Sequence, residues 1–268
     1  MSADERSGSS PPYSRSVRQL DELGYVYLPK VLSPDVLQSL CQQVDELFRR
    51  EGENAGSEFK TEPGAKRLAN LVNKGRIFRP LLLHSDIFPL VKHVLDDRVK
   101  LSSLNARSAN PHSETNQPLH CDMGAVPDEQ GFWVCNVVWL LDDFTIDNGA
   151  LRVVAGTHKS GILPADALFD TYAEHPQQEL VTGQAGSAIV MNAHLWHAGT
   201  SNRTAHPRRA VHAFYCRRDK PQQQYQKALV DRDTQLELSP GLRELLALDD
   251  ELNDRLSQMD VVRSGFMK

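Results

Sequence analysis

The segment Leu119-His120-Cys121-Asp122-Met123-Gly124 places an imidazole and a carboxylate two residues apart. In an extended chain, residues i and i+2 project from the same face, so His120 and Asp122 could bind one metal ion while Cys121 points away from it. His-x-Asp also occurs by chance, and an isolated histidine or aspartate in a turn usually only forms hydrogen bonds. The meaning of the motif therefore depends on the sequence around it.

Short segments with β-branched and aromatic residues surround this motif, and turn residues separate them. The pattern predicts strands at residues 25–29, 101–109, 119–122, 132–141, 150–154, 187–191 and 209–215. Strands at this spacing favour a sandwich or jelly roll over alternating βαβ units. The sequence therefore predicts a mainly β protein.

The chain divides into three parts by composition. Residues 1–14 are rich in Ser, Gly and Pro and poor in apolar residues, which predicts a disordered tail. Residues 15–220 have the length and apolar content of one domain with a single core. Residues 221–268 are polar with a weak helical pattern, and we expect a helical extension that packs on the same domain.

Helical periodicity precedes the β region. It predicts helices at residues 15–23, 34–51 and 86–95, the second with Ser33 as its N-cap. Between the last two, residues 51–79 lose this periodicity. We expect a long surface loop there, and because long loops are often functional it is a candidate lid.

Charge and composition exclude several classes of function. The formal net charge of the 268 residues is -5, with no basic excess to neutralise nucleic-acid phosphates. No apolar run approaches the roughly 20 residues that cross a bilayer, and no secretory signal is visible. The four cysteines form no C-x-x-C pair, which is typical of reduced thiols in a cytoplasmic protein. We expect a cytoplasmic protein without nucleic-acid or membrane partners.

Further histidines and arginines follow the His-x-Asp motif. The predicted strand at 187–191 leads into Asn192-Ala193-His194-Leu195-Trp196-His197-Ala198-Gly199, and then into Pro207-Arg208-Arg209. This order places a histidine just past one strand and an arginine at the start of the next, and in antiparallel neighbours both can face one cavity. A second histidine would complete the set of two histidines and one carboxylate that leaves coordination positions open on Fe(II).

Taken together, these motifs resemble the phytanoyl-CoA dioxygenase-like (PhyH) family of Fe(II)- and 2-oxoglutarate-dependent oxygenases. The resemblance runs from about residue 20 to about residue 218. It includes Gly24-Tyr25-Val26, Leu119-His120-Cys121-Asp122, Asn148-Gly149-Ala150-Leu151 and Leu195-Trp196-His197-Ala198-Gly199. It implies that residues 15–220 form a double-stranded β-helix, a cupin-like jelly roll of two facing antiparallel sheets, with helices buttressing one sheet.

The resemblance also implies roles for individual residues. It makes His120, Asp122 and His197 the iron ligands, and it makes Arg208 the partner of the distal carboxylate of 2-oxoglutarate. A guanidinium suits that task because its planar fork can bind a carboxylate through two hydrogen bonds and keeps its charge when partly buried.

Two neighbouring residues compete with these assignments, and one distant residue could add to them. The family spacing favours His197 over His194, for which a hydrogen-bonded structural role is the alternative. It also favours Arg208 over Arg209, because residues that alternate on a strand face opposite sides. Lys74 resembles a lysine that some relatives direct towards 2-oxoglutarate, although a solvated loop lysine is an equally good interpretation.

The implied reaction is oxidation of a C–H bond in a small organic substrate. O2 and 2-oxoglutarate would be consumed, and succinate and CO2 released. Because Asp122 supplies a carboxylate where a halogenating relative would need an open position for halide, the resemblance implies hydroxylation, desaturation or ring rearrangement.

Two other classes of protein remain compatible with the residues. A zinc hydrolase could use two histidines and one aspartate, but it would have no need of Arg208. A non-catalytic jelly-roll binding protein would need no metal. The expected entrance segments, residues 51–79, 123–131 and 162–179, contain no readable code for the substrate, and the sequence does not determine the oligomeric state.

Overall fold

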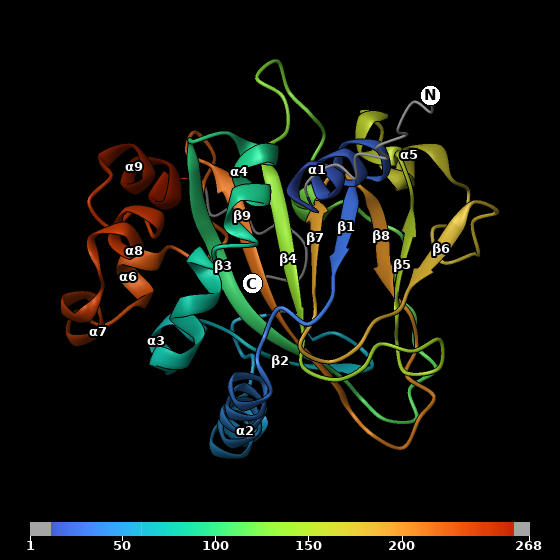
Figure 1. Ribbon diagram of the computed structural model, residues 1–268, viewed down its shortest axis with the longest axis horizontal. Helices are drawn as coiled ribbons and strands as arrows, with labels where there is room; N and C mark the ends of the chain where they lie inside the picture. Colours follow the sequence, from blue (N-terminus) through green and yellow to red (C-terminus); the bar gives the residue numbers. More distant parts are fainter. Residues whose placement is uncertain (1–11, 60, 260–268) are drawn as a thin grey trace, which may run out of the picture.

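The computed structural model describes residues 12–59 and 61–259 as two antiparallel β-sheets with helices around them (Figure 1). The larger sheet has the order β1-β7-β4-β9-β3-β2, and the smaller has the order β6-β5-β8. The strands are β1 (Tyr25–Leu28), β2 (Ala65–Leu68), β3 (Val99–Ala109), β4 (Val134–Leu140), β5 (Leu151–Val154), β6 (Gln178–Val181), β7 (Ala188–Asn192), β8 (Trp196–Gly199) and β9 (Arg208–Arg217). This architecture is the double-stranded β-helix that was predicted.

The longer strands lie where the periodicity of the sequence predicted them, with small shifts of their ends. Three strands were missed, namely β2, β6 and β8. Each has only four residues, too few for alternation to stand out, and each is defined by a hydrogen-bonded neighbour, which is β3 for β2 and β5 for both β6 and β8.

The predicted strand at 119–122 is wrong in its extent. His120 forms only an isolated bridge with His197, and the chain then enters the short 3-10 helix η3 (Asp122–Gly124), in which Met123 has a φ of 58°. Cys121 between them is extended, with φ -101° and ψ 141°. His120 and Asp122 therefore keep the i, i+2 relationship on which the metal hypothesis depends.

Helix α2 (Pro34–Glu51) follows the signals in its sequence. The Ser33 hydroxyl accepts a hydrogen bond from Val36 N, Pro34 occupies the first turn, and Leu40, Val44 and Leu47 are buried on one face. Helix α1 (Pro12–Leu23) begins inside the predicted tail, while residues 1–11 of that tail lie outside the described residues. Helix α4 (Phe88–Leu95) occupies most of the third predicted helix.

Residues 51–79 do not form the long surface loop that was predicted. The described part of this range contains η1 (Gly52–Asn54), β2, α3 (Leu71–Lys74) and the first residues of η2 (Arg76–Leu83). Leu68, Leu71, Val72 and Phe78 are fully buried in the main core. The elements are too short to show a periodic pattern, so only their packing reveals them.

The C-terminal part consists of the short helices α6 (Gln226–Leu229), α7 (Arg232–Glu237), α8 (Pro240–Leu245) and α9 (Glu251–Met259). Val230, Leu245 and Leu248 belong to the same apolar cluster as the outer face of the large sheet. The buried Lys100 of β3 donates a hydrogen bond to Asn253 Oδ1 of α9 at 2.8 Å. In the part of the chain that the structure describes, no helix combines the length and apolarity needed to cross a bilayer.

The large sheet has two different faces. The outer face and the helices share the main core, which includes Trp139 and Tyr215. The inner face meets the small sheet through a second cluster that includes Val138, Val153 and Met191. Because side chains alternate along a strand, the same strands that bury the main core also present side chains to the space between the sheets.

Candidate metal centre

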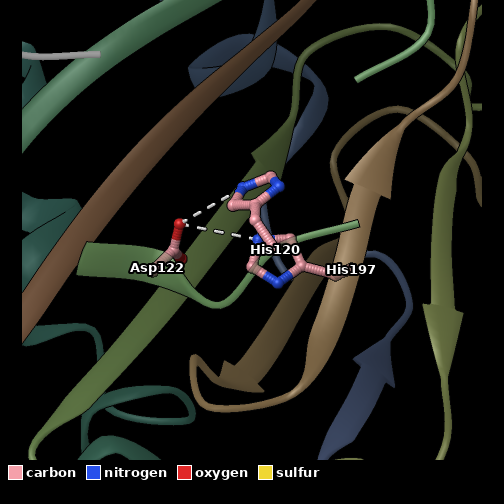
Figure 2. A group of neighbouring side chains, drawn as sticks. All are labelled: His120, Asp122 and His197. Carbon is pink, nitrogen blue, oxygen red and sulfur yellow. Dashed lines mark ion pairs between the residues drawn. The ribbon is translucent and has the colours of Figure 1, made fainter. Parts of the chain in front are cut away.

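Three potential metal ligands converge between the two sheets (Figure 2). His120 and His197 bridge two chain segments, and each backbone N–H donates to the other residue's carbonyl at 3.0 Å. Asp122 Oδ1 lies 3.8 Å from Nε2 of His120 and 3.5 Å from Nε2 of His197. One potential ligand atom from each residue lies within 4.8 Å of the other two.

Local backbone hydrogen bonds orient both imidazoles. His120 Nδ1 lies 2.9 Å from Pro118 O, and His197 Nδ1 lies 2.8 Å from Leu195 O. A carbonyl oxygen can only accept, so each Nδ1 carries a proton, and in the neutral imidazole Nε2 is then the ring nitrogen with a lone pair. These are the tautomers that a metal bound at Nε2 requires.

The charges and hydrogen bonds around Asp122 favour its ionised form. Burial opposes ionisation of Asp122, but the His197 and His120 imidazoles and the amide of Asn136 hold the pKa of this carboxyl below its usual value. Burial and the neighbouring His197 lower the pKa of His120 to about 4. His120 is therefore neutral at pH 7, the form in which imidazole binds a metal.

Asn136 is a supporting residue that the sequence reasoning missed. Its side chain is buried on β4, and its Nδ2 donates to Asp122 Oδ2 at 3.2 Å. This bond occupies the carboxylate oxygen other than the one that faces the histidines. The sequence did contain a signal for this role: Asn136 is the one amide in the otherwise apolar strand Val134–Leu140. A buried amide needs a hydrogen-bond partner, so such a residue is a candidate for supporting a site.

The three residues line a cavity of about 410 Å³ between the sheets. Arg208, at the start of β9, also lines this cavity and is 3% exposed. Its Nη2 donates to Gly149 O at 2.7 Å, and its guanidinium lies 4.0 Å from the centre of the Phe144 ring. Among the described residues Nε of Arg208 has no hydrogen-bond partner, so the group can still donate to a ligand in the cavity.

Burial and the nearby Arg107 lower the pKa of Arg208 to about 9, which leaves the guanidinium charged at pH 7. The adjacent Arg209 points to the opposite face of the sheet. There it forms ion pairs of 2.7 Å with Asp142 and with Asp45 of α2. Strand alternation thus places Arg208, and not Arg209, beside the three metal-ligand candidates.

Two other candidates from the sequence lie elsewhere. Lys74 is not among the residues that line the cavity, and its Nζ forms an ion pair of 2.8 Å with Glu51. The structure therefore gives no support to Lys74 as a cosubstrate ligand. His194 is buried against Phe132, its Nδ1 lies 2.8 Å from Asn192 Oδ1, and it is not part of the three-residue group.

Two donor sets in the cavity fit the groups that the sequence implies. Two imidazoles and one carboxylate form the ligand set typical of non-haem Fe(II) sites. A buried, charged guanidinium with an unpartnered N–H suits the carboxylate of an organic acid.

Comparison with known proteins identifies relatives in sequence and in structure. The chain is 29% identical over 247 residues to dioxygenase af480 of Aspergillus fumigatus, which covers 85% of this chain and 75% of that protein. It is 28% identical over 220 residues to dioxygenase trt7 of Aspergillus terreus, with coverages of 74% and 71%.

Solved structures share the fold. The non-haem α-ketoglutarate-dependent carbocyclase SnoK of nogalamycin biosynthesis has a TM-score of 0.64 at 18% identity and covers 79% of this chain and 88% of its own. HygX of Streptomyces hygroscopicus, solved with nickel and 2-oxoglutarate bound, has a TM-score of 0.61 at 15% identity, with coverages of 78% and 88%.

The family comparison covers most of the chain. The phytanoyl-CoA dioxygenase (PhyH) family model matches residues 20–210, a range that contains strands β1 to β8 and the start of β9, together with the three clustered ligand candidates and Arg208. The chain therefore belongs to the phytanoyl-CoA dioxygenase (PhyH) family of Fe(II)- and 2-oxoglutarate-dependent oxygenases.

Proposed function

We propose that the protein oxidises a C–H bond of a small organic substrate, with His120, Asp122 and His197 holding Fe(II) and Arg208 holding the distal carboxylate of 2-oxoglutarate. One observation carries this proposal. The three ligand atoms lie within 4.8 Å of one another on the wall of a cavity that also contains the buried Arg208 guanidinium. The names of the fungal dioxygenase relatives support the same reaction class.

Iron and 2-oxoglutarate together supply the activation of O2, with succinate and CO2 as by-products. The chain supplies position and environment. The Pro118 and Leu195 carbonyls fix the two imidazoles, and Asn136 fixes the carboxylate. Arg208 orients the cosubstrate, and because its guanidinium is buried, charge-assisted hydrogen bonds there are stronger than in water.

Metal binding tests the ligand assignment. We expect the purified protein to bind one Fe(II) per chain under anaerobic conditions, and His120→Ala, Asp122→Ala and His197→Ala each to lose most of this iron. A three-residue site has no spare ligand. Colorimetric determination of iron after dialysis measures the effect.

His194→Ala is the matched control, because His194 is also buried and lies three positions from His197. It should keep its iron. If His197→Ala retained full iron while His194→Ala lost it, the distal ligand would be His194. Tight zinc binding with no response to 2-oxoglutarate would instead favour a zinc hydrolase.

A further inference from the structure

A glutamine of the C-terminal part reaches the cavity. Gln223, which follows β9, lines the cavity wall, although it lies outside residues 20–210, the range that the family model matches. Its backbone N–H donates to Ser102 Oγ at 2.8 Å, and its side-chain Oε1 accepts from Ser103 Oγ at 2.7 Å. Hydrogen bonds to two adjacent residues of β3 therefore hold both the backbone and the side chain of Gln223.

The hydrogen bonds around Ser103 assign the two ends of the Gln223 amide. Ser103 Oγ accepts from Asn105 Nδ2 at 3.1 Å and donates its single proton to Gln223 Oε1. The other end of the amide, Nε2, donates to no acceptor among the described residues. Because Gln223 is only partly buried and lines the cavity, this N–H group is available to a ligand.

Phe214 separates Gln223 from the metal-ligand candidates. It is opposite Ser103 of β3 on one side and opposite Asn136 of β4 on the other, and opposite residues share one face of a sheet. Ser103 donates to Gln223, whereas Asn136 donates to Asp122. Neighbouring strands lie about 4.8 Å apart, which places Ser103 and Asn136 about 10 Å from each other, on either side of Phe214.

The proposed cosubstrate lies away from Gln223. Arg208 begins β9, and Phe214 follows six residues later, about 20 Å along an extended strand. 2-Oxoglutarate held between Arg208 and the metal runs towards Asn136, which is across Phe214 from Gln223. The side chain of Phe214 also lines the cavity, so its ring can contact a further ligand between Gln223 and the metal.

The charged residues of this wall lie towards the Arg208 end. Arg107 is opposite Ala210 in the β3–β9 register, and Arg67 is opposite Arg107 in the β2–β3 register. Ala210 precedes Phe214 by four residues, about 13 Å of strand. The Gln223 end therefore offers a ligand a neutral amide donor and an aromatic ring, which suit an uncharged molecule.

We infer that the substrate is an uncharged molecule whose apolar body packs on Phe214 and whose carbonyl or hydroxyl oxygen accepts a hydrogen bond from Gln223 Nε2. This inference rests on the proposed function, because it takes the metal as the place of oxidation. The C–H bond that is oxidised then lies across Phe214 from this oxygen, on the order of 10 Å away. Gln223 thus determines which substrates bind, and in which orientation.

The test uses a matched pair of probes, 2-acetylnaphthalene and 2-isopropenylnaphthalene, in which a CH2 group replaces the carbonyl oxygen. Protein loaded with Mn(II) and saturating 2-oxoglutarate is titrated with each probe by calorimetry. The net contribution of one neutral hydrogen bond corresponds to a preference of about three- to tenfold for the ketone in the wild type. Equal affinities, or no detectable binding of the ketone, would overturn the inference.

Variants separate the hydrogen bond from the apolar contact. Gln223→Leu should reduce the preference to nearly one by weakening ketone binding, while the alkene binds at least as well as before. Phe214→Leu should weaken both probes by a similar factor, about three- to tenfold, and keep the preference. If Gln223→Leu weakened both probes equally, Gln223 would have only a structural role and the inference would fail.

Gln235→Leu is the matched control, since Gln235 is also a partly buried glutamine of the C-terminal part but does not line the cavity. It should keep the preference for the ketone. The affinity for 2-oxoglutarate is measured in every variant. If Gln223→Leu lost 2-oxoglutarate binding and kept the ketone preference, Gln223 would belong to the cosubstrate site and the inference would fail. If the wild type bound no 2-oxoglutarate, the proposed function itself would fail, whichever probe bound more tightly.

Discussion

At the scale of single residues, the two histidines of the candidate metal centre are oriented in the same way. Each imidazole Nδ1 bonds to the carbonyl two residues earlier in its own segment, Pro118 for His120 and Leu195 for His197. The ring orientation is thus set by a few adjacent residues. Asp122 differs, because its orientation depends on Asn136, a residue of the separate strand β4.

Asn136→Ala should therefore weaken metal binding without removing a ligand. Loss of a hydrogen-bonding partner behind a metal ligand typically costs about ten- to a hundredfold in affinity. Competition of Fe(II) against a coloured chelator measures this change. Cys135→Ala, which alters the other face of the same strand, should leave the metal affinity near that of the wild type.

Arg208 gives a second prediction at this scale. If its guanidinium forms two charge-assisted hydrogen bonds to 2-oxoglutarate, each worth about 1.5–3 kcal/mol, Arg208→Ala should weaken cosubstrate binding roughly a hundredfold or more. Iron binding should survive because the arginine is not a ligand. Arg208→Lys should recover only part of the loss, since an ammonium lacks the planar fork.

The measurement is an anaerobic titration of 2-oxoglutarate, followed by the absorbance of its Fe(II) chelate. Arg209→Ala serves as the control and should titrate like the wild type. An unchanged midpoint in Arg208→Ala would show that another group holds the distal carboxylate.

At the scale of elements, β2 is the edge strand of the large sheet, and ion pairs reinforce its attachment. Its backbone pairs with β3, and Glu62 joins Arg67 of β2 to Arg107 of β3. Burial disfavours the ionised form of Glu62 and by itself would raise its pKa. The two arginines outweigh this effect and hold the Glu62 pKa at about 2.

The sign of the resulting pH effect follows from this depressed pKa. Glu62 stabilises the fold above its unfolded pKa of 4.5, and this contribution is lost as the pH falls from about 4.5 to about 2. A depression of this size corresponds to roughly 3 kcal/mol. The free energy of unfolding of the wild type should therefore fall towards that of Glu62→Gln over this range.

Urea unfolding of the metal-free protein at several pH values measures the effect. Glu46→Gln is the control, because Glu46 forms an exposed ion pair with Arg49 that contributes little. It should follow the wild type at every pH. A constant difference between the wild type and Glu62→Gln down to pH 2 would contradict the prediction.

At the scale of the whole molecule, the jelly roll and the C-terminal helices share one core. Leu246, which follows α8, is fully buried in the cluster that covers the outer face of the large sheet. Gln222 donates to both Leu101 O of β3 and Leu246 O, at 2.7 and 3.0 Å. We therefore expect residues 221–259 to unfold together with the sheets.

Leu246→Ala should lower the free energy of unfolding by about 2–5 kcal/mol, the usual cost of a large cavity in a core. The transition should remain single when it is followed by circular dichroism and by tryptophan fluorescence. Leu236→Ala is the control, since Leu236 is 73% exposed and should change stability by less than about 0.5 kcal/mol. Two separate transitions would assign the C-terminal helices to an independent unit.

The sequence by itself determined the long elements and named the candidate residues of the site. Strands such as β4 and β9 and helix α2 have enough residues for a period of two or of 3.6 to be readable. The His-x-Asp motif and the family spacing of His197 and Arg208 named the residues that the structure brings to one cavity. Each periodic element and the His-x-Asp motif lie within consecutive residues, and the resemblance to the family linked that motif to His197 and Arg208.

The tertiary structure decided what depends on contacts between distant segments. Residues 51–79 looked like a loop because their elements are short, yet Leu68 and Leu71 are held in the core by strands and helices far along the chain. Lys74 forms an ion pair with Glu51 and does not line the cavity. The Glu62 cluster joins residues up to 45 positions apart, and no periodicity encodes an ion pair at such a distance.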